Sequence, residues 1–266
     1  MSKYKWLLGM GLQKALAYRI NYAVTIMAAV FPIALQWVLW QAIFNYTEAD
    51  QLYGLSYSEM LSYVVLAALM AQALRTGFEY EMAEDIKSGG LNRFIVQPLS
   101  YFGFRLSVFI GTNLGYFVAT LAVMAVALWV AVEYWTLSIE LAHIALFVLS
   151  AIGAFFLQFM LFYLLSLTAF WLHEVWALFE SVRVISLVLS GGVVPLSVFG
   201  ESLEWWLSLL PFQYLIYFPL QTLTGVLSFE QIFFGLLLQF FWIGGLMLVI
   251  STIWRRGSRS YLALGG

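Results

Sequence analysis

Six segments of this chain are each apolar over the length that an α-helix needs to cross a lipid bilayer. A helix rises about 1.5 Å per residue, so about 20 apolar residues span the ~30 Å of hydrocarbon. Because the bilayer core offers the backbone no hydrogen-bonding partner, such segments are expected to be helical. The sequence therefore predicts an all-α polytopic membrane protein with six transmembrane helices. The segments lie at about 22–44, 60–77, 104–132, 144–171, 175–194 and 232–254.

The composition excludes several other classes of protein. Of the 266 residues, 63% are hydrophobic and only 10% are charged, whereas soluble domains have about 25% charged residues. A net charge of −2 gives no overall attraction for nucleic acid. The chain has no cysteine, which excludes disulfides and thiolate metal sites. We expect no metal site, no cofactor in this chain and no nucleic-acid partner.

Basic residues are distributed unevenly among the segments that connect the predicted spans. Eleven of the twelve lysine and arginine residues lie before the first span, around the loop between the second and third, or after the sixth. The loops after spans one, three and five contain acidic residues and no basic residue. Basic residues are concentrated in cytoplasmic loops. We therefore expect both termini to be cytoplasmic and residues 1–266 to form a single transmembrane domain.

The first 21 residues differ from a cleavable signal peptide, because Lys14 and Arg19 interrupt a short apolar stretch. Leu8, Leu12 and Leu16 recur at helical spacing. This pattern predicts a helix at 1–21 that lies in the membrane interface. The alternative is a longer, tilted first span.

The loop at 78–102 is the only sizeable connection on the predicted cytoplasmic side. A polar helix is expected in its first part, followed by a break at Ser88-Gly89-Gly90 and a stop at Pro98. One interpretation is a solvated loop with charged ends. The other is a docking surface that presents apolar side chains to a partner. Those side chains are Ile86, Leu91, Phe94 and Ile95.

The segment at 191–225 contains residues that interrupt a helix. Gly191, Gly192 and Pro195 interrupt the helix near the outer end of the fifth span, and Pro211 and Pro219 frame an apolar stretch too short to cross the bilayer. Broken backbone at membrane depth persists only where protein or a water-filled cavity covers it. We therefore expect a re-entrant pair of short helices in the outer leaflet, between spans five and six.

Glu180 and Arg183 lie three residues apart within the fifth span, so they share a helical face. Each charge costs roughly 2.5–3.5 kcal/mol at the middle of a membrane. The pair is either self-neutralising or part of a charged surface that faces a permeation path or another subunit.

Glutamines within or near the spans are expected to form interhelical hydrogen bonds, and a minority could line a pathway. Among them are Gln36, Gln72, Gln158 and Gln239.

No catalytic or nucleotide-binding motif is present in the sequence. It lacks G-x-x-x-x-G-K-[ST], the loop that cradles nucleotide phosphates, and it lacks the zinc motif H-E-x-x-H. Neither histidine lies near the serine of the Ser190-Gly191-Gly192 run. The sequence therefore predicts that this chain is not an enzyme.

Two stretches carry a resemblance to a known family. The first is DIKSGGLNRFIVQPLS, from Asp85 to Ser100, and the second is SGGVVPL followed by LLPFQYLIYFPLQ. In order and spacing they resemble the membrane subunits of bacterial type-2 ATP-binding-cassette exporters, in a poorly characterised branch. Ile95 and Gln97 depart from that pattern, in which leucine and arginine are common, and Gln97 makes the loop less basic.

The resemblance implies a role for the chain and for its cytoplasmic loop. The chain would be the permease subunit of an exporter in the bacterial inner membrane, where it would contact lipid and form the translocation path with an identical or sibling permease. A separate cytosolic ATPase would bind ATP and Mg²⁺ and dock on the loop. The implied docking residues are Asp85, Ile86, Lys87, Gly89, Gly90, Leu91 and Pro98. The alternatives are a secondary transporter or channel that works alone, and a membrane-integral enzyme.

Overall fold

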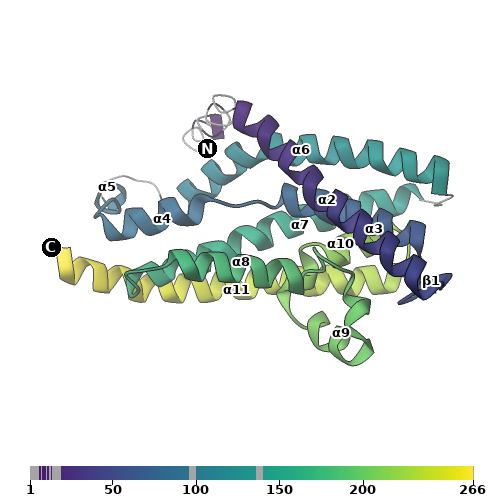
Figure 1. The fold of residues 1–266 in the computed structure, drawn as a ribbon. Coiled ribbons are helices and arrows are strands. Elements are labelled where there is room, and N and C mark those ends of the chain that lie inside the picture. Colours follow the sequence, from purple (N-terminus) through teal and green to yellow (C-terminus); the bar gives the residue numbers. More distant parts are fainter. Residues whose placement is uncertain are drawn as a thin grey trace.

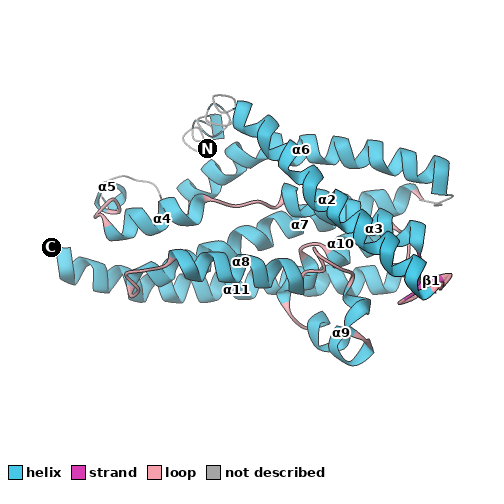
Figure 2. Cartoon of the chain, in the orientation of Figure 1, coloured by secondary structure: helices cyan, strands magenta, loops and turns pink. Residues whose placement is uncertain are grey.

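The computed structural model describes residues 6, 8, 9, 11, 13, 19–95, 100–135 and 140–265, and nearly all of this chain is helical (Figure 2). Each of the six predicted segments coincides with a helix. Within the described chain, three helical stretches are long and apolar enough to cross a membrane, namely Tyr57–Lys87, Leu141–Phe170 and Phe229–Arg259. The long helices are α2 (Arg19–Thr47), α3 (Tyr57–Ala73), α6 (Tyr101–Trp135), α7 (Leu141–Ser166), α8 (Trp176–Leu189) and α11 (Phe229–Gly265).

Shorter elements connect the long helices. The hairpin of β1 (Gln51–Leu52) and β2 (Leu55–Ser56) is antiparallel, with Gln51 opposite Ser56. Ser56 then caps α3, because its Oγ accepts from the amide of Glu59 while the Glu59 carboxylate accepts from the amide of Ser56. The other short elements are α4 (Phe78–Lys87), α5 (Asn92–Ile95), η1 (Leu167–Phe170), η2 (Leu196–Phe199), α9 (Glu201–Ser208), η3 (Pro211–Tyr214) and α10 (Tyr217–Leu223).

The elongated molecule has two distinct ends (Figure 1). One carries α4, α5 and the last turns of α11, and we call it the α4 end. The other carries the β1–β2 hairpin, the start of α7 and α9, and we call it the α9 end. The arginines that follow the sixth apolar segment therefore lie at the α4 end, with α4 and α5. The acidic loops before β1 and around α9 lie at the opposite end, as the charge pattern predicts.

The core of the molecule surrounds η3 and α10. These short elements pack against α3, α7, α8 and α11, and Leu220 and Leu223 are completely buried. Gly235 of α11 makes this packing possible, because a Cβ there would lie 2.1 Å from the Phe218 ring. A short apolar stretch is thus buried in protein rather than in lipid.

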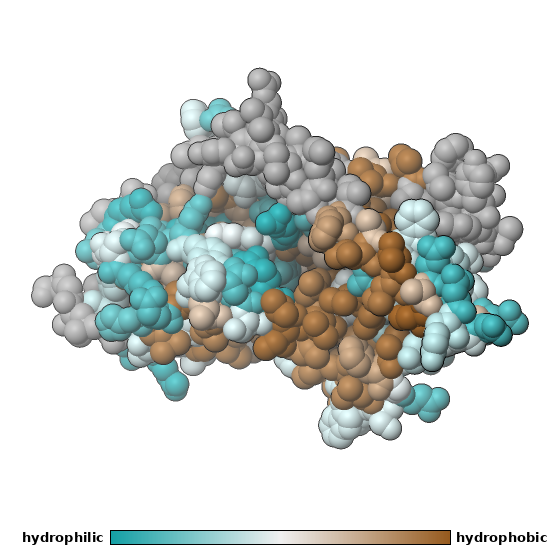
Figure 3. Space-filling model, viewed as in Figure 1, coloured by the Kyte–Doolittle hydropathy of each residue, from teal (hydrophilic) through white to brown (hydrophobic). Residues whose placement is uncertain are grey.

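Hydrophobic side chains also cover much of the surface in the middle of the molecule. In Figure 3 they form a broad area between hydrophilic groups at the α4 end and around the β1–β2 hairpin. On α11, Phe233, Phe241 and Leu248 are all exposed. Large continuous apolar surfaces of this kind are typical of contact with lipid or with another subunit.

The predicted interfacial helix at 1–21 lies mostly outside the described residues. Where the structure describes this region, Trp6, Leu8 and Gly11 are helical. Gly11 lies directly against Gly111 of α6, and a Cβ on Gly111 would lie 2.5 Å from the carbonyl oxygen of Leu8. The N-terminal segment therefore packs on α6 through a close approach that only glycine permits.

Candidate functional site

The polar loop after the second apolar segment forms a helix that is packed tightly on its own chain. Residues 74–77 interrupt the helix after α3, and α4 then packs against α7 and η1. Phe78, Met82 and Ile86 form the buried face of α4. Gly89 ends this region in a left-handed conformation with a φ of +82°, which glycine adopts without strain. The predicted break at Ser88-Gly89-Gly90 is confirmed.

The interpretation of Ile86 and Leu91 as exposed anchors for a partner is wrong. Each is only 4% exposed, and α7 and η1 pack against α4, the helix that carries Ile86. Phe94 is half-buried against Tyr101 and Phe104. The side chain of Ile95 and all of Pro98 lie outside the described residues. The exposed surface of the loop is instead polar and consists of Glu81, Glu84, Lys87, Ser88, Asn92 and Arg93.

Asp85 is the centre of a cluster that joins α4 and α5 to α6. Its carboxylate accepts hydrogen bonds from Arg93 at 2.6 Å, from the Tyr101 hydroxyl at 2.8 Å and from Arg105. Arg105 is 3% exposed, and it also donates to Glu81 at 2.8 Å. Gly90 packs against this carboxylate, since a Cβ there would lie 2.8 Å from Asp85 Oδ1. Charge-assisted bonds of this kind fix both distance and orientation.

A second charged network joins α4 to α8. Arg183 donates to Glu79 at 2.5 Å, and its Nε lies 3.5 Å from the carboxylate of Glu180. The Tyr80 hydroxyl donates to Glu180. Glu79 is fully buried. Arg183 and Glu180 therefore do form the predicted ion pair, but the pair is not self-contained, because the shorter bond of Arg183 reaches Glu79 on α4.

Lys87 provides a further link at this end, since its Nζ donates to the carbonyl of His173 in the turn before α8. Together, these contacts connect α4 to α6, to α8 and to the turn that precedes α8.

The backbone break after α8 is covered by protein, as expected for a break at membrane depth. Gly191 has a φ of +78°, and its carbonyl accepts a hydrogen bond from the Tyr63 hydroxyl at 2.7 Å. Gln36 donates to the carbonyl of Val193 at 3.0 Å. Gln239 donates to the carbonyls of Ser150 and Tyr214. These bonds confirm that glutamines of the long helices connect elements distant in sequence.

The segment at 191–225 contains the two predicted short helices. Pro195 precedes η2, Pro211 begins η3, and Pro219 lies within α10. A Cβ on Gly192 would lie 2.5 Å from Leu187, so close packing requires glycine there. The helix α9 exposes Trp205 and Trp206, whereas α10 is buried. The position of the segment 191–225 in the outer leaflet stays a prediction.

A first prediction concerns the break after α8. Gly191→Ala should destabilise the protein by roughly 2–3 kcal/mol, because it adds a left-handed backbone strain of about 1 kcal/mol and a steric clash. The new Cβ would lie 2.6 Å from Tyr63 Oη. Gly54→Ala is a matched control, since Gly54 has a φ of +79° but no atom within 4 Å of that Cβ. Thermal unfolding in detergent should show the larger loss for Gly191→Ala. Equal losses would show that the Tyr63 contact is unimportant.

A cavity of about 520 Å³ connects both helix breaks with the charged network. Its walls include Thr76 from the break after α3, Gly192 from the break after α8, and both Glu180 and Arg183. Gln158 of the apolar helix α7 also lines it. Gln158 is 9% exposed, and its Oε1 has no hydrogen-bond partner among the described residues. A buried polar atom without a partner is rare and is typical of a functional site.

Arg75 gives this cavity a positively charged margin. It lines the cavity and is exposed, and it has no ion pair with any described residue. The half-buried Arg183 is, by contrast, balanced by Glu79 and Glu180. The cavity therefore combines apolar walls with amide, guanidinium and carboxylate groups, which suits an amphipathic molecule better than a simple ion.

Long apolar helices, a separation of charge between the two ends and a partly open cavity with apolar and polar walls are features of a helical membrane protein. Residues 17–265 match the model of the family described as ABC-2 family transporter protein, so the chain belongs to this family. It is therefore a permease component of an ATP-binding-cassette transport system and not itself the catalytic subunit. A search of curated proteins and a search of solved structures find no match to this chain.

Proposed function

We propose that this chain is the transmembrane subunit of an ATP-driven exporter in the bacterial inner membrane. It forms the translocation path with a second permease chain, identical or sibling, and is coupled to a separate cytosolic ATPase. The observation that supports this most strongly is the position of α4. It ends in an exposed polar surface at one end of the molecule, while Glu79 and Asp85 link it to α8 and α6. An element so placed can convert ATPase movement into helix movement.

The docking surface in this proposal is the exposed polar face of α4 and α5. The buried Ile86 holds α4 against α7 and η1, Leu91 is buried as well, and Asp85, Gly89 and Gly90 maintain the shape of the loop. Exposed groups such as Glu84, Lys87 and Asn92 then contact the ATPase. The ATPase, and not this chain, supplies the site for ATP and Mg²⁺.

The translocation path in this proposal includes the cavity lined by Gln158, Arg75 and the Arg183 network. The exposed apolar residues of α2 and α8, among them Leu35 and Ile185, then face lipid or the second permease chain. An amphipathic substrate fits this combination, because its polar part can bind Gln158 and Arg75 while its apolar part contacts the walls.

The topology that we propose has six spans, with the α4 end in the cytoplasm. The chain has no native cysteine, so a single introduced cysteine reports its position without background. A cysteine at Glu48 or Glu201 should react with an impermeant maleimide in intact cells, because both positions are exposed at the α9 end. One at Glu84 or Arg256 should react only after the membrane is opened. Labelling of position 84 in intact cells would contradict this orientation.

The experiment that tests the function is purification of the tagged chain from its own membranes in mild detergent. An ATPase of the ATP-binding-cassette class should co-purify, and its hydrolysis should depend on the permease. Substrate transport by the purified chain without any ATPase would instead support the alternative of a secondary transporter or channel.

A further inference from the structure

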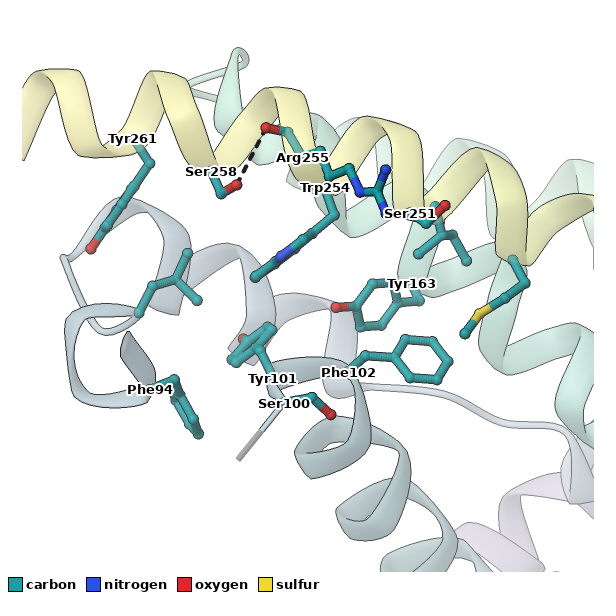
Figure 4. A pocket seen from close by; sticks show the side chains of 13 residues that line it. Phe94, Ser100, Tyr101, Phe102, Tyr163, Ser251, Trp254, Arg255, Ser258 and Tyr261 are labelled. Carbon is teal, nitrogen blue, oxygen red and sulfur yellow. Dashed lines mark hydrogen bonds between the residues drawn. The ribbon is translucent and has the colours of Figure 1, made fainter. Parts of the chain in front are cut away.

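A second cavity, separate from the one around Gln158, lies at the α4 end of the molecule (Figure 4). It has a volume of about 480 Å³, within the range of about 300–1,000 Å³ that is typical of ligand sites. Its walls come from α5, the start of α6, α7 and the last turns of α11. We call it the aromatic cleft, because most of its large side chains are aromatic.

The interior of the aromatic cleft is apolar and rigid. The rings of Tyr101 and Trp254 are stacked, with centroids 5.4 Å apart and planes 13° from parallel. Phe102 and Tyr163 meet edge to face at 5.1 Å on the opposite side. Figure 4 shows these rings directed toward the space between α6 and α11. Such apolar walls can bury the surface of a hydrocarbon chain.

The rim of the aromatic cleft carries positive charge that the chain does not neutralise. Arg255 lines the cleft, and it is exposed. Arg259, one helical turn further along α11, is also exposed. Neither has an ion pair with any described residue. Arg256 of the same helix is also exposed and has no ion pair with a described residue, whereas Arg93 and Arg105 near this end are balanced by acidic groups.

The cleft also lies at the level where α11 changes from apolar to charged. Met247 and Ile250 line its apolar side, and Arg255 and Ser258 line the other. This change marks the end of the segment apolar enough to cross a membrane, and tryptophan is enriched at that level. Trp254 occupies this position. The cleft is therefore placed at the boundary between hydrocarbon and lipid headgroups.

We propose that the aromatic cleft binds one anionic phospholipid of the adjacent leaflet. An acyl chain lies between the Tyr101–Trp254 stack and Phe102, and the phosphate contacts the guanidinium of Arg255. Basic pockets between transmembrane helices are suited to anionic headgroups. This site is separate from the cavity around Gln158, and it does not depend on the presence of an ATPase. Since the lipid would contact both α5 and α11, it would stabilise the arrangement of the α4 end.

Native mass spectrometry of the detergent-purified protein tests this site, with phosphatidylglycerol and phosphatidylcholine of identical acyl chains as probes. Phosphatidylglycerol should bind more tightly than phosphatidylcholine. Arg255→Gln should weaken phosphatidylglycerol binding about fivefold, since each arginine near a membrane surface contributes about 1 kcal/mol. Arg256→Gln is the matched control, because Arg256 is exposed on the same helix but does not line the cleft. It should bind phosphatidylglycerol like the unmodified protein.

Two further measurements, on a cleft-wall variant and on competition by glycerol phosphate, distinguish the lipid from other ligands. Ser258→Leu adds bulk to the cleft wall and should reduce phosphatidylglycerol binding without removing any charge, provided that its thermal unfolding is unchanged. Glycerol phosphate, which has the charge but no acyl chain, should not displace the lipid. Equal effects of Arg255→Gln and Arg256→Gln would overturn the proposal, as would displacement by glycerol phosphate. If Ser258→Leu does not fold, the comparison of the two arginine variants decides alone.

Discussion

Arg183→Gln should destabilise the protein by about 3 kcal/mol, the lower end of the cost of breaking a buried ion pair, because Glu79 is buried but the Arg183 side chain is 30% exposed. For a chain of this size, that loss corresponds to roughly 10 °C in the midpoint of thermal unfolding. The physical reason is that Glu79 is fully buried and loses its short bond to Arg183, so an unpaired carboxylate remains inside the protein. Thermal unfolding in detergent, followed by intrinsic fluorescence, measures the effect.

The double variant Glu79→Gln with Arg183→Gln should be more stable than Arg183→Gln alone, because no buried charge is then left without a partner. Arg93→Gln serves as a control, since the Arg93 side chain is 58% exposed and its ion pair with Asp85 should contribute at most about 1 kcal/mol. If the double variant is as unstable as the sum of the single variants, Glu79 and Arg183 do not act as a pair.

Glu84→Arg combined with Asn92→Arg should weaken binding of the ATPase at least tenfold, or about 1.4 kcal/mol. Both positions are exposed on the polar surface of α4 and α5, so the change alters the proposed docking surface without disturbing the core. Like charges placed opposite each other at an interface cost several kcal/mol. Titration of the ATPase onto the reconstituted permease measures its affinity directly.

Glu201→Arg is the matched control for this charge reversal. It changes an exposed glutamate at the α9 end, so it should leave ATPase affinity unchanged. Wild-type affinity in the Glu84→Arg, Asn92→Arg variant would show that the ATPase docks elsewhere.

Local features of the sequence predicted the long helices and the interruptions at Gly89 and Gly191, but not the break at 74–77, which lies within the predicted second span. Long apolar runs form helices wherever hydrophobic burial dominates, and all six runs are helical here. The breaks at Gly89 and Gly191 were also predictable, because each requires a positive φ that other residues rarely adopt. The prolines at 195 and 211 lie at the starts of short turns for a similarly local reason.

Contacts between distant segments could not be predicted in the same way. Glu79 is separated from Arg183 by 104 residues, and no periodicity in either helix indicates that the two meet. Ile86 and Leu91 fitted an outward or an inward orientation equally well, until the packing of α4 on α7 showed which face is covered. Gln158 was grouped with other glutamines of the long helices, and its Oε1, like that of Gln239, lacks a hydrogen-bond partner among the described residues. Only the structure places Gln158 in the wall of the cavity.

The central claim is that the exposed surface of α4 contacts a separate ATP-binding-cassette ATPase. Site-specific photo-crosslinking in living cells tests it most directly, with a photoreactive amino acid at position 84 and, as the matched comparison, at position 201. Position 84 should give a crosslinked product that contains an ATPase of this class, and position 201 should give none. A crosslink to the ATPase from position 201 but not from position 84 would contradict both the proposed orientation and the proposed coupling surface.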